Sequence, residues 1–382
     1  MKIALLTTDG REVFKDYDTP APHFGSAPTA LMQGFALRPE LEVHVVACAR
    51  AKVNAPPKLA PNIFFHSLCV PKIGWLSTGY QGCIRAVRRK LEEIQPDLVH
   101  GQGTELDCAV SAVFSGFPNV VTIHGNMEAL ARQFRARVGS FYWLTARLEN
   151  FTLKRTAGVF CNSSYTEQLV RSRARRTWRV ANAVREAFFA PAAASARSAR
   201  CTVVNLGLIA PRKRQLELLE VVRELRQQGL DFEFQFVGDV SPDKNYVSAF
   251  REKIKPMERE GYARYLGLKT GGELVHLFDG AAGMVHFSPA ESFGLAVAEG
   301  LARDLKIFGA RVGGVPEITA GLTEAELFGV DDWRGLTSAI TAWIRRGFPR
   351  AHGAGDVIRE RCHPKIIAER HVEIYREVLG RN

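Results

Sequence analysis

Short apolar runs alternate along most of the chain with longer segments whose apolar positions recur at helical spacing. The short runs indicate buried strands, and the longer periodic segments indicate amphipathic helices. Strands that alternate with helices predict an α/β fold with parallel sheets covered by helices on both faces. The expected strands are residues 2–8, 42–48, 63–66, 97–100, 120–124, 158–161, 202–207, 232–238, 264–266, 282–287 and 306–309.

The length of the chain predicts two domains. Its 382 residues exceed what one hydrophobic core of ordinary size holds. Residues 190–198 are rich in alanine, show no periodicity, and indicate a linker. We therefore expect, in order, a first domain at 1–188, a linker at 189–200, a second domain at 201–362 and a C-terminal helix at 363–382.

Composition narrows the class of protein. Hydrophobic residues make up 46% and charged residues 24%, as in ordinary globular proteins. No apolar run approaches the ~20 residues that cross a bilayer. The seven cysteines are scattered without a CxxC pair, which argues against a disulfide framework or a zinc site. The short apolar start at residues 1–6 fits a first strand better than a signal peptide, so we expect the cytosol.

Positive charge is concentrated in one segment. The chain carries a net charge of +11, and residues 131–179 hold eleven lysines and arginines against only Glu149 and Glu167. Such a segment can face anionic lipid, an acidic acceptor or nucleic acid, or it can be a solvated helix surface. We do not expect nucleic acid, because no recognised module is present and aromatic residues are not interleaved with the cations.

The same segment contains an apolar stripe at helical spacing, which predicts one helix over residues 128–156. The stripe either packs in the core, the commoner fate of such residues, or lies on a membrane surface and admits a lipid-linked acceptor. Its members are Leu130, Phe134, Val138, Phe141, Leu144, Leu148 and Phe151.

Two carboxylates lie eight residues apart in the most informative segment, residues 289–300. An apolar strand precedes the segment and a helix begins within it. Glu291 therefore lies in the loop at the carboxyl end of a strand, and Glu299 lies about two turns into the helix. Ligands bind at that edge of open α/β sheets, where the amides of a helix N-terminus also favour phosphate.

Three consecutive cations follow the strand that ends at Gly207. Arg212, Lys213 and Arg214 lie at the expected strand-to-helix turn. Cations in this position can hold a diphosphate, although a solvent-facing basic loop is the simpler alternative. The shared sheet edge favours the binding role, because the Glu291 loop also follows a strand.

Other candidates are one histidine and several glycines at strand ends or turns. His124 ends a strand before a glycine and is either structural or a ligand. Gly25 lies in the loop after the first strand, Gly238 ends another strand, and Gly313-Gly314 begins a short helix. Glycines permit close approach of backbone to a ligand or simply form turns.

Taken together these motifs resemble the GT-B glycosyltransferases, specifically the retaining family 4 type. The resemblance implies an α/β fold of two Rossmann-like domains facing a central cleft, with the helix at 363–382 crossing back to the first domain. The matching segments are the Gly25 loop, His100, TIHG at 122–125, CNSS at 161–164, VANAV at 180–184, NLGLIAPRKRQ from 205, FVGD from 236, SPAESFGLAVAEGLA from 288 and VGGVPEI from 312.

The resemblance implies transfer of a sugar from a nucleoside-diphosphate sugar with retention of anomeric configuration. It assigns Glu291 to the donor sugar near the reacting centre and Glu299 to the ribose hydroxyls. Lys213 takes the place of the diphosphate-binding lysine of the family. His124 is assigned to the sugar from the other domain.

The resemblance also implies a set of donor-binding residues. The family commonly has an arginine where this chain has Leu208, so we expect Arg212 or Arg214 to supply that charge. The remaining donor contacts are expected from Phe293, Gly294, Leu295, Gly25, Gly207 and Gly238.

We expect no metal and no cofactor, because cations and helix amides can stabilise the departing diphosphate. No Asp-x-Asp element lies beside a plausible cleft strand, and Asp331-Asp332 is expected to cap a helix. The expected partners are a nucleotide-sugar donor and an unidentified acceptor, which is a glycan, a lipid-linked molecule or a small molecule. Peripheral contact with the anionic inner face of a membrane stays open. The alternative function is a catalytically inactive GT-B-like protein that binds a nucleotide sugar or polyanion.

Overall fold

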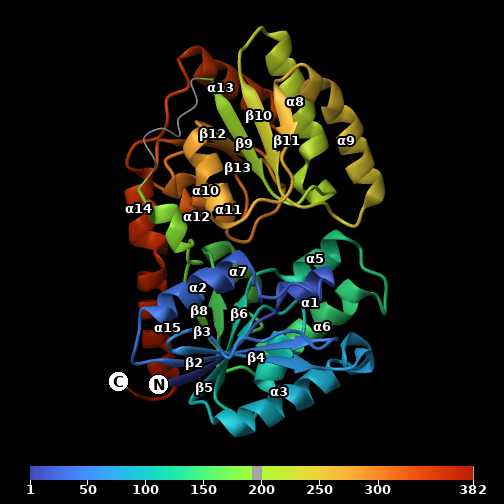
Figure 1. The fold of residues 1–382 in the computed structure, drawn as a ribbon, viewed down its shortest axis with the longest axis vertical. Helices are drawn as coiled ribbons and strands as arrows, with labels where there is room; N and C mark the ends of the chain where they lie inside the picture. Colours follow the sequence, from blue (N-terminus) through green and yellow to red (C-terminus); the bar gives the residue numbers. More distant parts are fainter. Residues whose placement is uncertain (192–199, 382) are drawn as a thin grey trace. The chain divides into compact units, whose positions relative to one another are not determined.

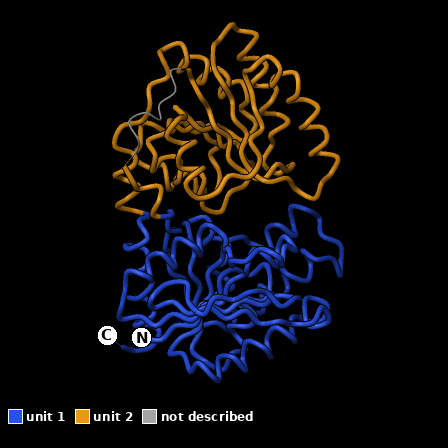
Figure 2. Tube along the Cα trace, in the orientation of Figure 1, with its two compact units in different colours: residues 1–185, 362–382 blue, residues 186–361 orange. Residues whose placement is uncertain are grey.

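The computed structural model describes residues 1–191 and 200–381, which form two compact units (Figure 2). Unit 1 comprises Met1–Arg185 and Cys362–Asn382, and unit 2 comprises Glu186–Arg361. Most of the expected linker falls at 192–199, outside the described residues. Each unit contains one sheet with helices on both faces (Figure 1).

The sheet of unit 1 has the strand order β3-β4-β2-β1-β5-β6-β7-β8. Its strands pair in parallel, except that β3 runs antiparallel to β4. The strands are β1 (Lys2–Leu6), β2 (Glu42–Ala49), β3 (Lys58–Ala60), β4 (Ile63–Cys69), β5 (Leu98–Gln102), β6 (Asn119–Ile123), β7 (Val159–Cys161) and β8 (Thr177–Arg179).

Successive side chains of the central strand β1 pack in two different hydrophobic cores, one on each face of the sheet, because strand side chains alternate between faces. Ile3 and Leu5 pack with the helices α2 and α15, whereas Ala4 and Leu6 pack with α3 and α4. This two-sided burial explains the continuous apolar run that predicted the strand. The helices of unit 1 are α1 (Gly10–Phe14), α2 (Ser26–Ala36), α3 (Gln81–Ile94), α4 (Cys108–Val113), α5 (Met127–Gln133), α6 (Phe141–Leu153), α7 (Ser164–Val170) and α15 (Pro364–Val378).

The C-terminal helix α15 is part of unit 1 and packs against α2 (Figure 1). A Cβ on Gly34 would lie 2.2 Å from the carbonyl oxygen of Pro364, so the two helices approach closely at this glycine. Tyr375 Oη lies 2.5 Å from Nδ1 of His100, and His100 Nε2 lies 2.7 Å from Thr122 Oγ1. Burial holds the pKa of His100 well below its usual range, so this histidine is a neutral core residue.

The single helix expected over residues 128–156 is wrong. α5 ends at Gln133 and α6 begins at Phe141, and the turn between them contains Arg135 at φ 46° and Gly139 at φ 81°. Left-handed backbone at two positions cannot continue an α-helix. The apolar stripe is consequently split, and Val138 in its middle is 81% exposed.

Unit 2 contains six parallel strands in the order β11-β10-β9-β12-β13-β14. The chain runs outward from β9 to β11 and then returns to place β12 on the other side of β9. The loops after β9 and β12 therefore leave the same edge of the sheet as neighbours, where open α/β sheets bind ligands. The strands are β9 (Thr202–Leu206), β10 (Glu233–Val237), β11 (Ala263–Tyr265), β12 (Gly283–His286), β13 (Lys306–Ala310) and β14 (Ala325–Phe328).

Helices cover both faces of the second sheet. α8 packs against α9 and α13 on one face, and α11 packs on β12 and β13 on the other (Figure 1). The helices of unit 2 are α8 (Gln215–Gln227), α9 (Lys244–Arg259), α10 (Gly271–Gly280), α11 (Leu295–Ala302), α12 (Val315–Ile318), α13 (Trp333–Arg345) and α14 (Ala354–Cys362), whose last residue belongs to unit 1. None of the helices in the described residues is long and apolar enough to cross a bilayer.

All the strands expected from the sequence are present, and the prediction missed β3, β8 and β14. The three missed strands lie at sheet edges. Every residue of β14 is only partly buried. These three edge strands are not covered on both faces along their length, so they lack the apolar run that indicates a strand, whereas the edge strand β11 was expected.

The hydroxyl of Tyr375 supports the core of unit 1. Tyr375→Phe leaves Nδ1 of His100 without its buried partner, which costs about 1–3 kcal/mol. We expect faster amide hydrogen exchange in β5, measured by mass spectrometry. Tyr142→Phe is the control, because the Tyr142 ring makes aromatic contacts and no hydrogen bond of its hydroxyl is found in the described residues. Unchanged exchange in the Tyr375 variant would contradict the assignment.

Candidate functional site

The structure brings Lys213 and Glu291 together in unit 2. Lys213 closes the short 3-10 helix η5 (Pro211–Lys213) after β9, and Glu291 lies in the loop after β12. Lys213 Nζ lies 2.8 Å from Oε2 of Glu291. Nε2 of His286, the last residue of β12, lies 3.0 Å from the same oxygen. The side chains of Lys213 and Glu291 are 12% and 18% exposed, so ligand can reach the pair from solvent.

Charge and burial fix the protonation of this cluster. Burial acts to raise the pKa of Glu291, but the Lys213 charge and the His286 hydrogen bond outweigh it and hold that pKa well below its usual range. Burial and the Lys213 charge lower the pKa of His286. Glu291 is therefore ionised near neutral pH, and neutral His286 donates its Nε2–H to it. His286 was not selected from the sequence, although its place at the end of the strand before Glu291 was a usable signal.

Backbone packing holds the Glu291 loop. A Cβ on Gly313, at φ 54°, would lie 1.5 Å from the carbonyl oxygen of Glu291, and Gly314 N donates to that oxygen over 3.2 Å. Only glycine fits so close an approach. The paired glycines thus contact the backbone of the Glu291 loop. Ser288 Oγ lies 3.0 Å from the carbonyl oxygen of Arg212. This contact links the Glu291 loop to the basic loop, the turn that carries the three cations 212–214.

The N-terminus of α11 carries the other residues of the segment. Gly294 is the N-cap at φ 93° and no side chain caps the helix, so amides of its first turn remain available to a ligand. Phe293 is buried beneath the loop, and Leu295 begins the helix. Glu299 is 3% exposed and projects from the second turn of α11.

The remaining cations of the basic loop differ in their contacts. Arg214 donates to the carbonyl oxygen of Val330 over 2.7 Å and pairs with Asp331 at 2.9 Å. Arg212 is exposed, and its guanidinium makes no ion pair within residues 1–191 and 200–381. Asp332 accepts from Gly335 N over 2.8 Å at the start of α13, which confirms the expected cap.

Two of the predicted glycines pack together at the ends of β9 and β10. A Cβ on Gly238, at φ 148°, would lie 2.1 Å from the carbonyl oxygen of Gly207. Gly207 in turn faces the aliphatic stem of Lys213, 3.5 Å from its Cδ. Both glycines therefore let the strand ends and the lysine stem come close together.

In unit 1, His124 follows β6 and lies beside the loop after β5. Its Nε2 is 3.0 Å from Oε1 of Gln102, and burial lowers its pKa to about 4. The imidazole is neutral at pH 7 and donates its Nε2–H to Gln102, which leaves Nδ1 as an acceptor. Glu105 Oε1 accepts from Gly125 N over 2.8 Å, and burial raises the pKa of this carboxyl. Gly25 is the N-cap of α2, without a side-chain cap.

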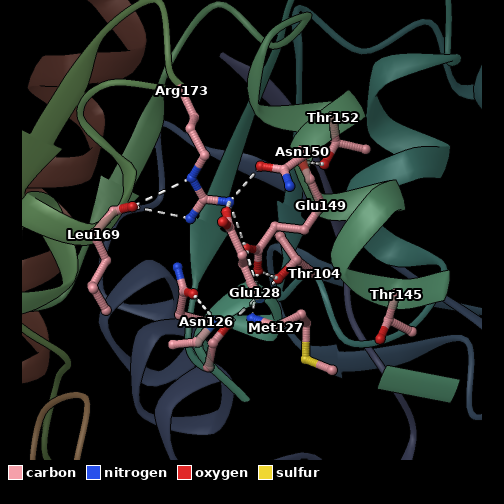
Figure 3. A network of polar contacts seen from close by, with 12 residues as sticks. Thr104, Asn126, Met127, Glu128, Thr145, Glu149, Asn150, Thr152, Leu169 and Arg173 are labelled. Atoms are coloured by element: carbon pink, nitrogen blue, oxygen red, sulfur yellow. Dashed lines mark hydrogen bonds and ion pairs between the residues drawn. The ribbon is translucent and has the colours of Figure 1, made fainter. Parts of the chain in front are cut away.

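A buried carboxylate that sequence reasoning missed organises the His124 loop (Figure 3). Glu149 of α6 accepts from Thr104 Oγ1 and from Met127 N, each over 2.8 Å. Arg173 Nη1 lies 3.0 Å from its other oxygen. Glu149 therefore joins the loop after β5, the start of α5 and the end of α7.

Arg173 extends this network and compensates the buried charge. Its Nη1 also contacts Asn150 Oδ1 at 2.6 Å and Glu128 Oε2 at 2.8 Å (Figure 3). One feature of the sequence indicated the pairing of Glu149 with Arg173. Glu149 is one of two acids in a strongly basic segment, and an acid there is a natural partner for a buried cation.

Among the described ranges 1–191 and 200–381, one group of three side chains could hold a metal ion. Ligand atoms of Cys48, Cys83 and Asp107 lie within 4.8 Å of one another in the core of unit 1. Hydrogen bonding with Cys83 and burial raise the pKa of Cys48 well above its usual range, and burial raises that of Asp107 to about 6. These groups satisfy one another in the core, with protonated thiols as weak donors.

Family comparisons match most of the chain. The model described as Glycosyltransferase Family 4 matches residues 31–187, and the one described as Glycosyl transferases group 1 matches residues 192–356. No curated protein sequence matches this chain significantly.

Solved structures share the fold over the whole chain. Sucrose-phosphate synthase from Thermosynechococcus elongatus is 17% identical, with a TM-score of 0.79 and 100% of both chains covered. HepE from Anabaena, in complex with UDP and glucose, is 16% identical, with a TM-score of 0.75, 99% of this chain and 100% of that chain covered. The lipopolysaccharide outer core galactosyltransferase WaaB is 13% identical, with a TM-score of 0.66, 99% of this chain and 100% of that chain covered.

The Glu149 network predicts a large stability effect. Glu149→Ala removes an anionic partner of Arg173 and leaves Thr104 Oγ1 and Met127 N without their acceptor, so we expect a loss of about 3–5 kcal/mol, measured by urea unfolding. Glu92→Ala is the matched control, because Glu92 pairs with Arg88 at 3.1 Å on the surface of α3, with both side chains exposed. That variant should lose about 1 kcal/mol or less. Equal losses would show that Glu149 holds no special place in unit 1.

Proposed function

Because the chain belongs to the glycosyltransferases of the family 4 type with the GT-B fold, we propose that it transfers a sugar from a nucleoside-diphosphate sugar to an acceptor. The transfer retains anomeric configuration and requires no metal. The observation that carries the proposal is the Lys213–Glu291 pair, which lies beside the uncapped N-terminus of α11 at the carboxyl edge of the second sheet.

Positive charge in the two loops stabilises the leaving group. Negative charge grows on the nucleoside diphosphate as its bond to the sugar breaks. Lys213 has three N–H donors and gives one to Glu291, so further donors can reach the diphosphate. Exposed Arg212 and the first amides of α11 add to this charge. These groups supply the charge stabilisation for which other enzymes use a metal ion, which supports metal independence.

Glu291 acts on the donor sugar in this proposal. Its ionised carboxylate accepts hydrogen bonds from sugar hydroxyls, and its charge stabilises the positive charge that develops at the reacting carbon. Lys213 and His286 hold the carboxylate ionised and oriented. Buried Glu299, on the same helix segment, binds the ribose hydroxyls, and Phe293, Gly294 and Leu295 contribute backbone contacts.

His124 and Gly25 are the residues of unit 1 that we assign to the donor. His124 is neutral, and its Nδ1 can accept a sugar hydroxyl while Nε2–H is held by Gln102. Gly25 offers backbone without a side chain at the start of α2. Gly207, Gly238 and Arg214 support the donor loops by packing and by holding the start of α8.

The segment between α5 and α6 supports peripheral contact with an anionic membrane. Phe134 is 46% exposed, Val138 81% and Phe141 44%. Exposed Arg135 and Arg137 lie in the same turn. Apolar side chains flanked by arginines fit a surface of acyl chains and anionic headgroups. We propose that the enzyme works in the cytoplasm at the inner face of the membrane.

Turnover and diphosphate binding test the donor site. Lys213→Ala should weaken nucleoside-diphosphate binding by about ten- to a hundred-fold, because it removes a charge-assisted contact. Glu291→Gln should lower kcat by about a hundred-fold or more with a smaller effect on diphosphate binding, because its charge acts at the reacting sugar. Calorimetry with a panel of nucleoside diphosphates gives binding, and diphosphate release from matching sugar donors gives turnover in the presence of EDTA.

Lys253→Ala is the matched control in unit 2, because this lysine pairs with Glu220 on the surface. Thermal unfolding of each variant separates lost function from lost structure. Intact turnover in Glu291→Gln would refute its role, and a requirement for added metal would refute metal independence. Diphosphate binding without any turnover would favour the catalytically inactive alternative.

Vesicle flotation tests the membrane contact. Val138→Asp with Arg135→Glu places acids in the exposed turn, so we expect the protein to lose binding to anionic vesicles at low salt. The double variant Arg223→Glu with Arg226→Glu, on α8 of unit 2, makes a comparable charge change away from the turn and should still float. If the native protein does not float with anionic vesicles, the membrane proposal is wrong.

A further inference from the structure

A groove in unit 1 has no role in the donor chemistry. Its volume is about 520 Å³, within the ~300–1,000 Å³ of small-molecule sites. It lies where β4 ends at Cys69, beside the 3-10 helix η1 (Lys72–Gly74) and the first turns of α3. We propose that this groove binds an anionic group attached to an apolar chain, and that it recognises a phosphate-bearing lipid acceptor. The acceptor assignment rests on the proposed glycosyl transfer.

One side of the groove is apolar. Val70, Ile73 and Ala86 line it, and Ile73 is 77% exposed. So exposed an isoleucine is favourably covered by an apolar chain. A volume of this size suits a single apolar chain.

The other side carries two cations one helical turn apart. Arg85 and Arg89 of α3 line the groove, and neither makes a hydrogen bond or ion pair within the described ranges 1–191 and 200–381. Like charges at this spacing destabilise a helix. Other cations of α3 are compensated, since Arg88 pairs with Glu92 at 3.1 Å and Lys90 with Glu93. The groove therefore offers two guanidinium groups, whose planar donors suit a phosphate.

The walls of the groove are held by backbone and ring contacts. A Cβ on Gly74 would lie 2.7 Å from Cα of Gly82, so η1 and α3 meet backbone to backbone. Trp75 Nε1 donates to the carbonyl oxygen of Val70 over 3.1 Å, and the Arg50 guanidinium lies 4.3 Å from the Trp75 ring centroid. A preformed site loses less conformational entropy on binding.

The position of the groove connects it to the acceptor unit. β4, β5 and β6 run parallel within one sheet, so Cys69 lies at the same sheet edge as the loops that carry Glu105 and His124. That edge is where ligands bind in open α/β sheets. A phosphate held by Arg85 and Arg89 thus fixes an amphiphilic acceptor at the carboxyl edge of unit 1.

The thiol of Cys69 can report whether a ligand occupies the groove, because Cys69 lines it. All seven cysteines lie among the described residues, and Cys69 alone is exposed. Dodecyl phosphate below its micellar concentration should slow modification of Cys69 by a thiol reagent, saturably and with one molecule per chain. The double variant Arg85→Gln with Arg89→Gln should weaken this protection by about ten-fold or more. Arg88→Gln, on the same helix outside the groove, is the matched control and should protect as the native chain does.

Three results would overturn the binding site. They are no protection by dodecyl phosphate, equal protection by neutral dodecyl glucoside, and equal protection by inorganic phosphate alone. The acceptor assignment has its own test, in which the double variant raises KM for an amphiphilic phosphate acceptor while nucleoside-diphosphate binding in unit 2 stays unchanged. An unchanged KM would refute that assignment. If dodecyl phosphate fails to protect Cys69, the proposal for the donor site in unit 2 is unaffected. If nucleoside diphosphates fail to bind, Cys69 protection still tests the groove.

Discussion

The parallel pairing of β9 with β12 is the constraint on which the proposed donor site depends. It makes the loops that follow these strands neighbours at one sheet edge, although they are distant in sequence. Lys213 and Glu291 then meet at 2.8 Å. A buried carboxylate without a partner is costly. The contact with Lys213 therefore lets Glu291 stay ionised inside the protein, and the same charge serves the chemistry proposed for the site.

Much of the fold could be predicted because buried strands have a recognisable apolar sequence pattern. Strands covered on both faces read as apolar runs, and every such run became a strand. The strands β3, β8 and β14 lie at edges and left no comparable run. The helix expected over residues 128–156 failed for a different reason. Apolar spacing reports direction around a helix axis and not burial, so exposed Phe134 and Val138 continued the pattern through a turn.

The candidate site likewise contains residues that could be predicted from the sequence and residues that could not. Glu291 and Lys213 could be selected because each follows a strand, and strand ends share an edge in a parallel sheet. Glu149 could not be selected from the sequence. Its partners Thr104 and Arg173 lie 45 and 24 residues away along the chain, and only the fold brings them together. The Gly313-Gly314 pair indicated either close approach to a ligand or a turn, and in the structure the two glycines contact the backbone of the Glu291 loop.

Charge compensation differs between the proposed donor site in unit 2 and the proposed acceptor groove in unit 1. In unit 2, exposed Arg212 makes no ion pair within residues 1–191 and 200–381, but Lys213 pairs with Glu291 and Arg214 with Asp331. A ligand there must compete with a carboxylate already in place, which favours a diphosphate with several strong acceptors over a single weak anion. In unit 1, Arg85 and Arg89 form no ion pair within the described residues. We expect a phosphate group to bind these arginines well only when an attached apolar chain adds contact area in the groove.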